Sequence, residues 1–438
     1  MKYIFCFFTL VFGLQIKSVS AQNTFDAKLK SVDLINKFKA QKFHEVYVQM
    51  DETMKRQIDE EQLEAIWVGL EMQFDSILKI EESTEIEVDS MVVTITPVQF
   101  KSIKLGLKFA FNNKQQISGF YIVPVNFSHQ VANYVNTSVF YEIKKNIPSR
   151  KFPSEGILTL PDAKKNLPVI IIVGGSGPTD KDLTVGPNKI YKDLAWGLAA
   201  KGIAVYRYDK RTVKFGSAIA KNKKATVKQE YLEDLKMIVK MLGKMPTIDP
   251  AQIYVLGHSE GGYLIPYFAK NIQGIKGFIC KAGNYNLLGE LLPYQYTYLA
   301  NHSKSAQEKE AILALLPKAI YARDRFTKNS PKDSLPTGFT TPYLFHLNEN
   351  CPEKLLSYIQ NYPLLLLQGA RDYQVPVTEF NRWKQALSTH PNTTFKLYPD
   401  LNHLFLPGKG DSVPSEYMKT GNVPEVVIDD LVNWVLKK

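Results

Sequence analysis

From residue 168 to the end of the chain, short apolar runs alternate with longer segments of helical periodicity. The run at 169–173 is apolar at every position, which is typical of a strand that is covered on both faces. Strands separated by helices predict a doubly wound, mostly parallel α/β sheet with right-handed crossovers. The other predicted strands are 203–208, 253–256, 277–280, 364–368 and 394–398, and the predicted helices are 194–200, 226–242, 261–271, 377–387 and 424–438.

A long insert, from about residue 284 to 361, interrupts this alternation after the strand at 277–280. It contains helical runs, and we expect it to form a lid over a pocket at the sheet. Its candidate lining groups are the aromatic side chains of Tyr294, Tyr296, Tyr298 and Phe345.

The chain in front of this pattern predicts a separate small α+β domain over residues 22–124. Helical periodicity changes there to an alternation with period two at 103–111. Two helices on a curved antiparallel sheet would satisfy both patterns, and the α/β part would then span residues 125–438, with an antiparallel edge at 139–143 and 156–160. The expected buried stripes of the two helices are Leu29, Val32, Ile35 and Phe38, and Leu63, Ile66, Trp67, Leu70 and Phe74.

Residues 1–21 have the pattern of a secretory signal peptide. Lys2 precedes an apolar run over residues 3–14, and Val19-Ser20-Ala21 places small residues before a cleavage site expected after Ala21. The apolar run is too short to cross a bilayer. We therefore expect an exported protein, periplasmic or secreted, with no membrane span.

Charge and cysteine content narrow the expected partners. The formal net charge is +11, but the basic residues are scattered and show no aromatic-basic pattern typical of nucleic-acid binding. Cys280 ends an apolar run, so we expect Cys280 and Cys351 to be free thiols rather than a bridge. No Cys/His spacing predicts a metal site, and no cofactor is expected.

The motif Gly257-His258-Ser259-Glu260-Gly261 lies directly between the strand at 253–256 and the following apolar helix. A serine on a tight strand-to-helix turn has strained dihedral angles, so the residues around it must be small. The N-terminus of the helix behind it also favours developing negative charge. This context predicts Ser259 as a nucleophile rather than as part of a structural turn.

A serine nucleophile needs a general base and an acid that orients the base. Asp372 follows the strand at 364–368 and His403 follows the strand at 394–398, so both are expected at the same carboxyl edge of the sheet as Ser259. The order Ser, Asp, His is the one typical of this motif. The alternative acid is Asp400, on the His403 loop, and the other histidines weighed as base are His258, inside the turn, His302 and His346, in the insert, and His390, which precedes its strand.

Stabilisation of an oxyanion requires two backbone donors. One is expected from Glu260, the residue after the nucleophile, and the other from the loop Gly174-Gly175-Ser176-Gly177-Pro178, with Ser176 as the candidate. Glycines let the backbone of this loop approach a ligand closely. The loop lacks a following Lys-Ser/Thr and the G-x-G-x-x-G spacing, so no nucleotide site is predicted.

Several stretches together carry a family resemblance. They are Gly175-Ser176-Gly177-Pro178 with Asp180 and Asp182, Gly186-Pro187-Asn188-Lys189, residues 193–199, Tyr208-Asp209-Lys210-Arg211-Thr212, residues 257–262, residues 368–376 and Asn402-His403-Leu404-Phe405. This set resembles the bacterial α/β-hydrolases related to dienelactone hydrolases and carboxylesterases that carry an extra N-terminal domain. It spans most of residues 168–438, and residues 25–123 resemble, more weakly, the small domain fused in front of such enzymes.

The resemblance implies an α/β-hydrolase fold, a triad of Ser259, Asp372 and His403, and ester hydrolysis. Many relatives have His-Gly where this chain has Gly174-Gly175, which leaves the geometry of the oxyanion loop open. We therefore expect an exported serine hydrolase that acts on a small-molecule ester through an acyl-enzyme. A serine peptidase or acyltransferase would share the first half-reaction, and a non-catalytic envelope- or carbohydrate-binding protein is a further alternative. The sequence leaves the acyl group, the leaving group and the oligomeric state open.

Overall fold

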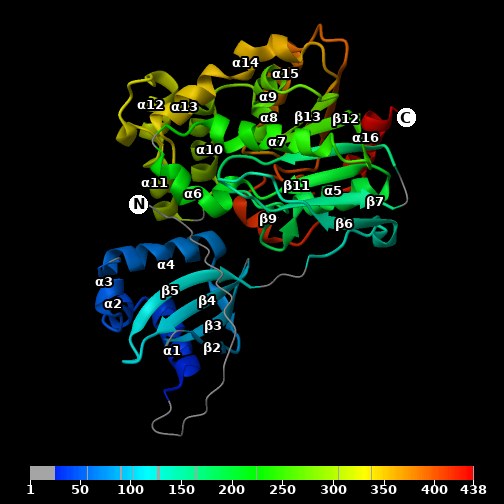
Figure 1. Cartoon of the computed structure of the whole chain (residues 1–438). Helices are drawn as coiled ribbons and strands as arrows, with labels where there is room; N and C mark the ends of the chain where they lie inside the picture. Colours follow the sequence, from blue (N-terminus) through cyan, green and yellow to red (C-terminus); the bar gives the residue numbers. More distant parts are fainter. Residues whose placement is uncertain are drawn as a thin grey trace. The chain divides into compact units, whose positions relative to one another are not determined.

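The computed structural model describes residues 25–437, except residues 57, 89–90, 102, 126–128, 163–164, 223, 304 and 337. The predicted signal peptide, residues 1–21, lies outside the described residues. The chain forms two compact units, one built mainly from residues up to 123 and the other mainly from residues 124–438 (Figure 1). Within the described part of the chain, no helix has the length and apolar character needed to cross a bilayer.

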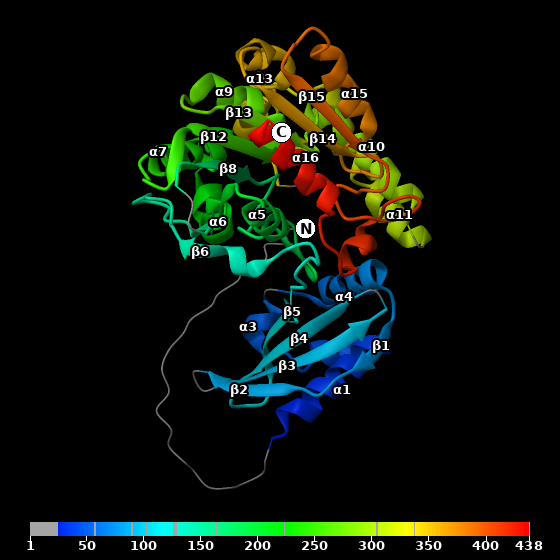
Figure 2. The ribbon, with the colours of Figure 1, turned by 90° about the vertical axis from the view of Figure 1, so that its right-hand side faces the viewer.

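The first unit is a small α+β domain whose described residues form a five-stranded sheet. Helix α1 packs against this sheet, since Ser31 Oγ lies 2.6 Å from Thr94 Oγ1 of β3 and the ring of Phe38 stacks on that of Phe120 in β5 (Figure 2). The strand order is β1-β3-β4-β5, with β2 paired to β3. The elements are α1 (Ala27–Lys39), α2 (Phe43–Tyr47), α3 (Glu52–Lys55), α4 (Glu60–Phe74), β1 (Ile77–Ile80), β2 (Thr84–Val88), β3 (Met91–Phe100), β4 (Lys104–Phe111) and β5 (Ile117–Pro124).

Two expectations for this unit need correction. Leu29 is 69 % exposed, because the buried face of α1 is rotated from the predicted stripe and consists of Ser31, Leu34, Ile35 and Phe38. Strands β1 and β2 and the short helices α2 and α3 were not predicted. The helices α2 and α3 have five and four residues, too few to show a helical period.

The second unit contains, within the described residues, an eight-stranded sheet of order β15-β14-β13-β12-β8-β11-β7-β6. Neighbours from β11 to β15 run parallel, whereas β7 and β6 form an antiparallel edge. The predicted doubly wound, mostly parallel sheet is therefore confirmed. The strands are β6 (Phe140–Lys144), β7 (Gly156–Pro161), β8 (Leu167–Val173), β11 (Ala204–Tyr208), β12 (Ile248–His258), β13 (Gly277–Lys281), β14 (Leu364–Gly369) and β15 (Thr393–Tyr398), with a small hairpin of β9 (Thr184–Val185) and β10 (Asn188–Lys189).

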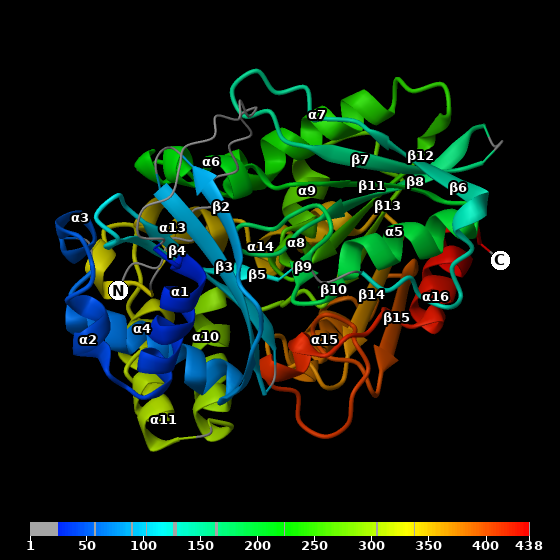
Figure 3. The same cartoon turned by 90° about the horizontal axis from the view of Figure 1, so that it is seen from below.

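Helices cover both faces of this sheet, as the continuous apolar strands require. Successive side chains of β8 enter two different cores, with Ile171 packed among residues of α7 and α9 and Ile170 among residues of α5 and α16. Figure 3 shows α5 and α16 side by side on one face. The helices are α5 (Ile190–Ala200), α6 (Arg211–Lys221), α7 (Glu233–Leu242), α8 (Glu260–Tyr263), α9 (Ile265–Asn271), α15 (Val377–Ala386) and α16 (Glu425–Leu436).

Two predicted helices are irregular. The helix expected at 261–271 is split into α8 and α9 at Leu264, where Pro266 follows at the start of α9 and supplies no backbone N–H. The helix expected at 226–242 opens with a wide π-helical turn at Lys228–Leu232 before α7. This turn buries three consecutive side chains, those of Glu230, Tyr231 and Leu232.

The predicted insert lies between β13 and β14 and is mainly helical. Cys280 in β13 and Cys351 at the start of α14 are both free and buried, as predicted. The helices of the insert are α10 (Leu288–Asn301), α11 (Ala306–Leu313), α12 (Leu316–Asp324), α13 (Thr341–Glu349) and α14 (Pro352–Leu355).

Candidate active site

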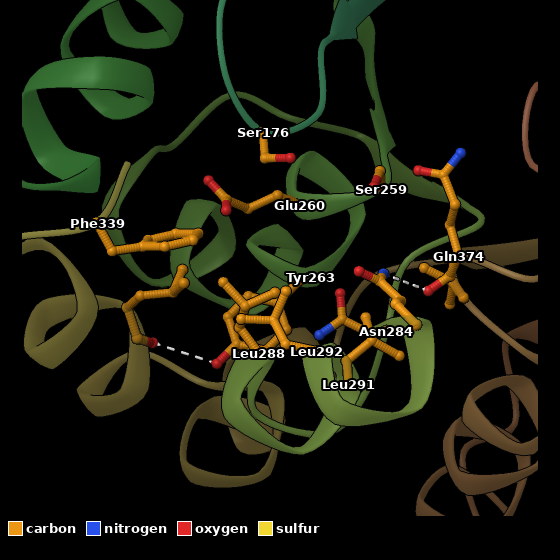
Figure 4. A pocket seen from close by; sticks show the side chains of 13 residues that line it. Ser176, Ser259, Glu260, Tyr263, Asn284, Leu288, Leu291, Leu292, Phe339 and Gln374 are labelled. Carbon is orange, nitrogen blue, oxygen red and sulfur yellow. Dashed lines mark hydrogen bonds between the residues drawn. The ribbon is translucent and has the colours of Figure 1, made fainter. Parts of the chain in front are cut away.

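Ser259 lies on the sharp turn between β12 and α8. Its backbone has φ 56° and ψ −121°, a strained conformation for a residue with a side chain. A Cβ at Gly257 would come within 2.1 Å of the Gly261 carbonyl oxygen, and one at Gly261 within 2.7 Å of the Val173 carbonyl oxygen. Only glycine therefore fits these two positions. The turn presents Ser259 to a cavity (Figure 4).

Asp372 and His403 lie on the loops after β14 and β15 and are brought into contact. His403 Nδ1 lies 2.7 Å from Asp372 Oδ2, and both side chains are buried. The backbone N–H groups of Gln374 and Val375 donate to Asp372 Oδ1, each at 2.8 Å, and Gln368 Nε2 donates to Oδ2 at 3.2 Å. The donors from Gln368, Gln374 and Val375 thus fix the orientation of this carboxylate, which in turn orients the imidazole of His403.

His403 also lies against the turn that carries Ser259. Its ring centroid is 4.9 Å from that of His258, the residue before Ser259. Among the described residues, Nδ1 of His403 pairs with Asp372 and not with Asp400, and no protein group bonds to its Nε2. The second ring nitrogen is therefore available as a base at the carboxyl edge of the sheet, where β12, β14 and β15 end.

The oxyanion loop lies next to the same turn. A Cβ at Gly175 would lie 3.0 Å from Ser259 Cβ, so the loop passes directly beside the nucleophile position. Ser176, Ser259 and Glu260 line one cavity. In the described part of the chain, neither the backbone N–H of Ser176 nor that of Glu260 donates to another protein group. Both predicted donors are therefore available to a bound oxyanion.

The cavity has a volume of about 230 Å³ and is lined by both polar and apolar side chains. Helix α10 presents Leu288, Leu291, Leu292 and Gln295 to it, four positions that share one face of a helix. The aromatic side chains predicted as liners, those of Tyr294, Tyr296, Tyr298 and Phe345, are not among the residues found to line it, so this prediction was wrong. Tyr298, further along α10, instead stacks on Tyr373 with ring centroids 5.1 Å apart. The remaining liners are Tyr263, Asn284, Phe339, Leu347, Gln374 and Val375.

Comparison with known proteins identifies the family. Esterase EstD of Thermotoga maritima is 32 % identical over 385 residues, which cover 88 % of this chain and 89 % of that protein. A family model described as serine aminopeptidase, S33, matches residues 188–408. The chain belongs to this family of α/β-hydrolases. It is a serine hydrolase, and the family resemblance drawn from its motifs is confirmed.

The N-terminal domain of the hydrolase matches a second family model at residues 31–120, described as a protein of unknown function, DUF3887. Among solved structures, an esterase of Pyrococcus furiosus is 15 % identical with a TM-score of 0.41, covering 72 % of this chain and 97 % of that chain. An esterase of Pyrobaculum calidifontis is 14 % identical with a TM-score of 0.42, covering 68 % and 85 %. These similarities are too low to bear on function.

Two buried groups of the hydrolase that sequence reasoning missed support the His403 loop. The carbonyl oxygen of His403 lies 3.2 Å from His258 Nε2 and 3.4 Å from Lys281 Nζ. Burial lowers the pKa of His258 well below its usual value, with Lys281 and His403 acting in the same direction. A neutral His258 can donate from Nε2 to this carbonyl and accept at Nδ1 from Tyr191 Oη, 3.0 Å away. Burial also lowers the pKa of Lys281 to about 7, against the opposing effect of Asp372.

A resident metal finds no support in the described residues of the hydrolase. They contain no group of three or more His, Cys, Asp or Glu side chains that could hold a metal ion. The sheet edge thus brings together a serine on a strained turn, a histidine paired with an aspartate, and two backbone N–H groups without a partner among the described residues, around or beside one cavity.

Proposed function

We propose that this serine hydrolase cleaves carboxylic esters, with Ser259 as nucleophile, His403 as general base and Asp372 as the acid that orients His403. The observation that carries the proposal is the 2.7 Å contact between His403 Nδ1 and Asp372 Oδ2, beside the strained turn of Ser259. The name of the relative from Thermotoga maritima, Esterase EstD, supports the ester as substrate.

The reaction follows from these positions. His403 takes the proton of Ser259 Oγ as the hydroxyl attacks the acyl carbonyl, and Asp372 stabilises the imidazolium that forms. The N–H groups of Ser176 and Glu260 donate to the oxyanion. His403 then protonates the leaving alkoxide. In the second half-reaction His403 takes a proton from a water molecule that attacks the acyl-enzyme, and it returns this proton to Ser259 Oγ as the carboxylic acid leaves.

The size of the cavity favours short acyl groups. Its volume of about 230 Å³ lies below the roughly 300–1,000 Å³ of pockets that hold drug-sized ligands. The side chains of Leu288, Leu291 and Leu292 form an apolar wall that suits an aliphatic acyl chain. We therefore propose small aliphatic esters as the preferred substrate class.

Replacement of the nucleophile tests the proposal. Ser259→Ala should abolish turnover of nitrophenyl esters and labelling by a fluorophosphonate, because the turn accepts a small side chain but the hydroxyl is lost. Ser388→Ala, at an exposed serine after α15, should behave as wild type. A Ser259→Ala variant that keeps more than about a hundredth of the wild-type kcat would rule Ser259 out, given the decades that a triad serine supplies.

The substrate panel separates esterase from peptidase. The matched family model carries a peptidase description, so nitrophenyl esters of graded chain length should be assayed beside aminoacyl nitroanilides. We expect the highest kcat/KM for a short acyl ester. Higher kcat/KM for the anilides would make this enzyme a peptidase with the same three residues.

Export is part of the proposal. The sequence pattern of residues 1–21 is typical of a secretory signal. The mass of the protein recovered from the periplasm or the medium should correspond to a chain that begins at Gln22. A protein that stays in the cytoplasm with residues 1–21 attached would contradict export without affecting the proposed chemistry.

A further inference from the structure

A buried polar cluster contacts the oxyanion loop, and none of its side chains has a part in the chemistry described above. It consists of Lys210, Glu230, Tyr231, Glu260 and Tyr343. The first four are buried, and Lys210 is only 1 % exposed. Lys210 belongs to the motif at residues 208–212, Glu230 and Tyr231 to the wide π-helical turn, Glu260 to α8, and Tyr343 to α13 of the insert.

Lys210 makes two hydrogen bonds and one ion pair in and beside this cluster. Its Nζ lies 2.7 Å from the carbonyl oxygen of Gly175, 2.8 Å from Tyr231 Oη and 2.6 Å from Glu230 Oε1. A fully buried ammonium is tolerated only when it is paired and hydrogen-bonded in this way. Because burying an ammonium costs free energy, we expect Lys210 to have a role at the loop that it contacts.

That role follows from the geometry of one peptide unit. The carbonyl of Gly175 and the N–H of Ser176 belong to the same planar trans peptide and point in opposite directions. Because Lys210 holds the carbonyl on one side, the N–H of Ser176 is directed away from the cluster. The Ser259 side chain lies next to Gly175. A cation on the carbonyl oxygen also polarises the peptide and strengthens its N–H as a donor.

The second expected oxyanion donor is connected to the same cluster. Tyr231 Oη and Tyr343 Oη lie 2.8 Å and 2.7 Å from Glu260 Oε1. Tyr231 Oη also lies 2.8 Å from the Gly175 carbonyl oxygen, but it has one proton, and since Lys210 already donates to that carbonyl, Glu260 Oε1 is its better acceptor. One cluster therefore holds both the Gly175–Ser176 peptide and Glu260, and α13 of the insert contacts it through Tyr343.

We propose that Lys210 is a positioning residue of the oxyanion hole: with Tyr231 and Glu230, it orients and polarises the Gly175–Ser176 peptide so that the Ser176 N–H meets the oxyanion. This inference rests on the proposed ester hydrolysis at Ser259. It assigns a role to the Lys210 motif.

The test removes the buried charges in a balanced way. In the full chain, Lys210→Met combined with Glu230→Gln removes the ammonium and its carboxylate partner together. Arg211→Met combined with Asp234→Asn is the matched control, since it removes a neighbouring buried ion pair of the same motif that does not contact Gly175. Each variant is assayed for kcat and KM with a short acyl nitrophenyl ester. Its Ki is measured for an aryl trifluoromethyl ketone, which forms a tetrahedral adduct with the serine, and for the corresponding methyl ketone.

The Lys210/Glu230 variant should lower kcat about 10- to 100-fold, part of the roughly 10²–10³-fold that one oxyanion donor supplies. KM and the Ki of the methyl ketone should change less than about twofold, whereas the Ki of the trifluoromethyl ketone should rise by a factor similar to the loss in kcat. The control pair should leave kcat and both Ki values within about twofold of wild type. A structural role alone would not separate the two ketones.

Equal losses of kcat in both pairs, or an unchanged Ki for the trifluoromethyl ketone, would overturn the proposal. If the paired variant does not fold, Tyr231→Phe tests the same proposal, because it removes a single hydroxyl. It should lower kcat about three- to tenfold and weaken binding of the trifluoromethyl ketone but not of the methyl ketone. A wild-type kcat for Tyr231→Phe would equally overturn the proposal. Turnover that survives Ser259→Ala would instead refute the proposed function. Turnover that depends on Ser259 but not on Lys210 would refute this inference alone.

Discussion

Replacing Lys281 by methionine should stabilise this hydrolase at neutral pH, and the gain should shrink as the pH rises. The Lys281 side chain is fully buried at the end of β13, 3.4 Å from the His403 carbonyl oxygen and 4.0 Å from the centre of the Phe405 ring. These contacts replace the hydration of an ammonium poorly, and burial lowers the pKa of Lys281 from 10.5 to about 7. Methionine has a similar length and carries no charge.

The size of the effect follows from this change in pKa. In the unfolded chain Lys281 titrates at its ordinary value of 10.5, so between pH 7 and pH 10.5 the unfolded state holds a proton that the native state has released. The native state therefore gains stability as the pH rises through this window. Below pH 7 the native state carries the charged ammonium, and its burial then lowers the free energy of unfolding by the full amount. A pKa lowered by about 3.5 corresponds to about 5 kcal/mol. Linkage gives a cost of about 4 kcal/mol at pH 7 and about 2 kcal/mol at pH 9.

Guanidinium unfolding of wild type and Lys281→Met at pH 7 and pH 9 measures this cost. The advantage of the variant in free energy of unfolding should fall by about 2 kcal/mol between the two pH values. Lys276→Met, at an exposed lysine just before the same strand, is the control and should show the same difference from wild type at both pH values. If Lys281→Met is less stable than wild type at pH 7, or if its advantage does not depend on pH, the buried ammonium is satisfied by its partners and the reasoning fails.

Three further predictions concern the site and its surroundings. Asp372→Asn should lower kcat by about 10⁴, because the amide favours the wrong tautomer of His403, whereas Asp400→Asn should stay near wild type; steady-state kinetics showing the reverse would exchange their roles. Leu291→Ala should enlarge the cavity and move the highest kcat/KM to longer nitrophenyl esters, and an unchanged chain-length profile would place the acyl group elsewhere. Cys280 and Cys351 should react with iodoacetamide only after unfolding, as followed by mass spectrometry, and failure to react without a reductant would indicate a bridge.

The parts of the site that could be predicted from the sequence are those with local physical demands. The turn of Ser259 needs small residues at fixed positions, and a strand followed by a helix surrounds it, so the motif and its context appear together in the chain. The loops of Asp372 and His403 could be placed because parallel strands end at one edge of the sheet. A residue that follows a parallel strand lies at one edge of the sheet, and a residue that precedes the strand lies at the other. These positions can therefore be assigned without knowledge of any long-range contact.

The helices of the insert show what could not be predicted from the sequence. These helices could be recognised from their period, but the face that each turns toward the cavity could not, because aromatic and aliphatic side chains both occur around α10. Tyr298 is used for stacking on Tyr373, and Leu288, Leu291 and Leu292 line the cavity instead. The face of α1 was misjudged for the same reason, since Leu29 and Leu34 both fit a helical stripe and only packing against the sheet selects Leu34.

By itself, then, the sequence determined the alternation of strands and helices from residue 168 onward, the sharp turn of Ser259 and the edge of the sheet at which Asp372 and His403 stand. Those features follow from backbone dihedral angles and hydrophobic period, which act over a few neighbouring residues. Only the tertiary structure decided which polar groups are buried together. Lys210 and Lys281 look like ordinary lysines in the chain, yet one meets Gly175 across 35 residues and the other meets His403 across 122. The free energy of a buried charge depends on such distant partners, and no local pattern encodes them.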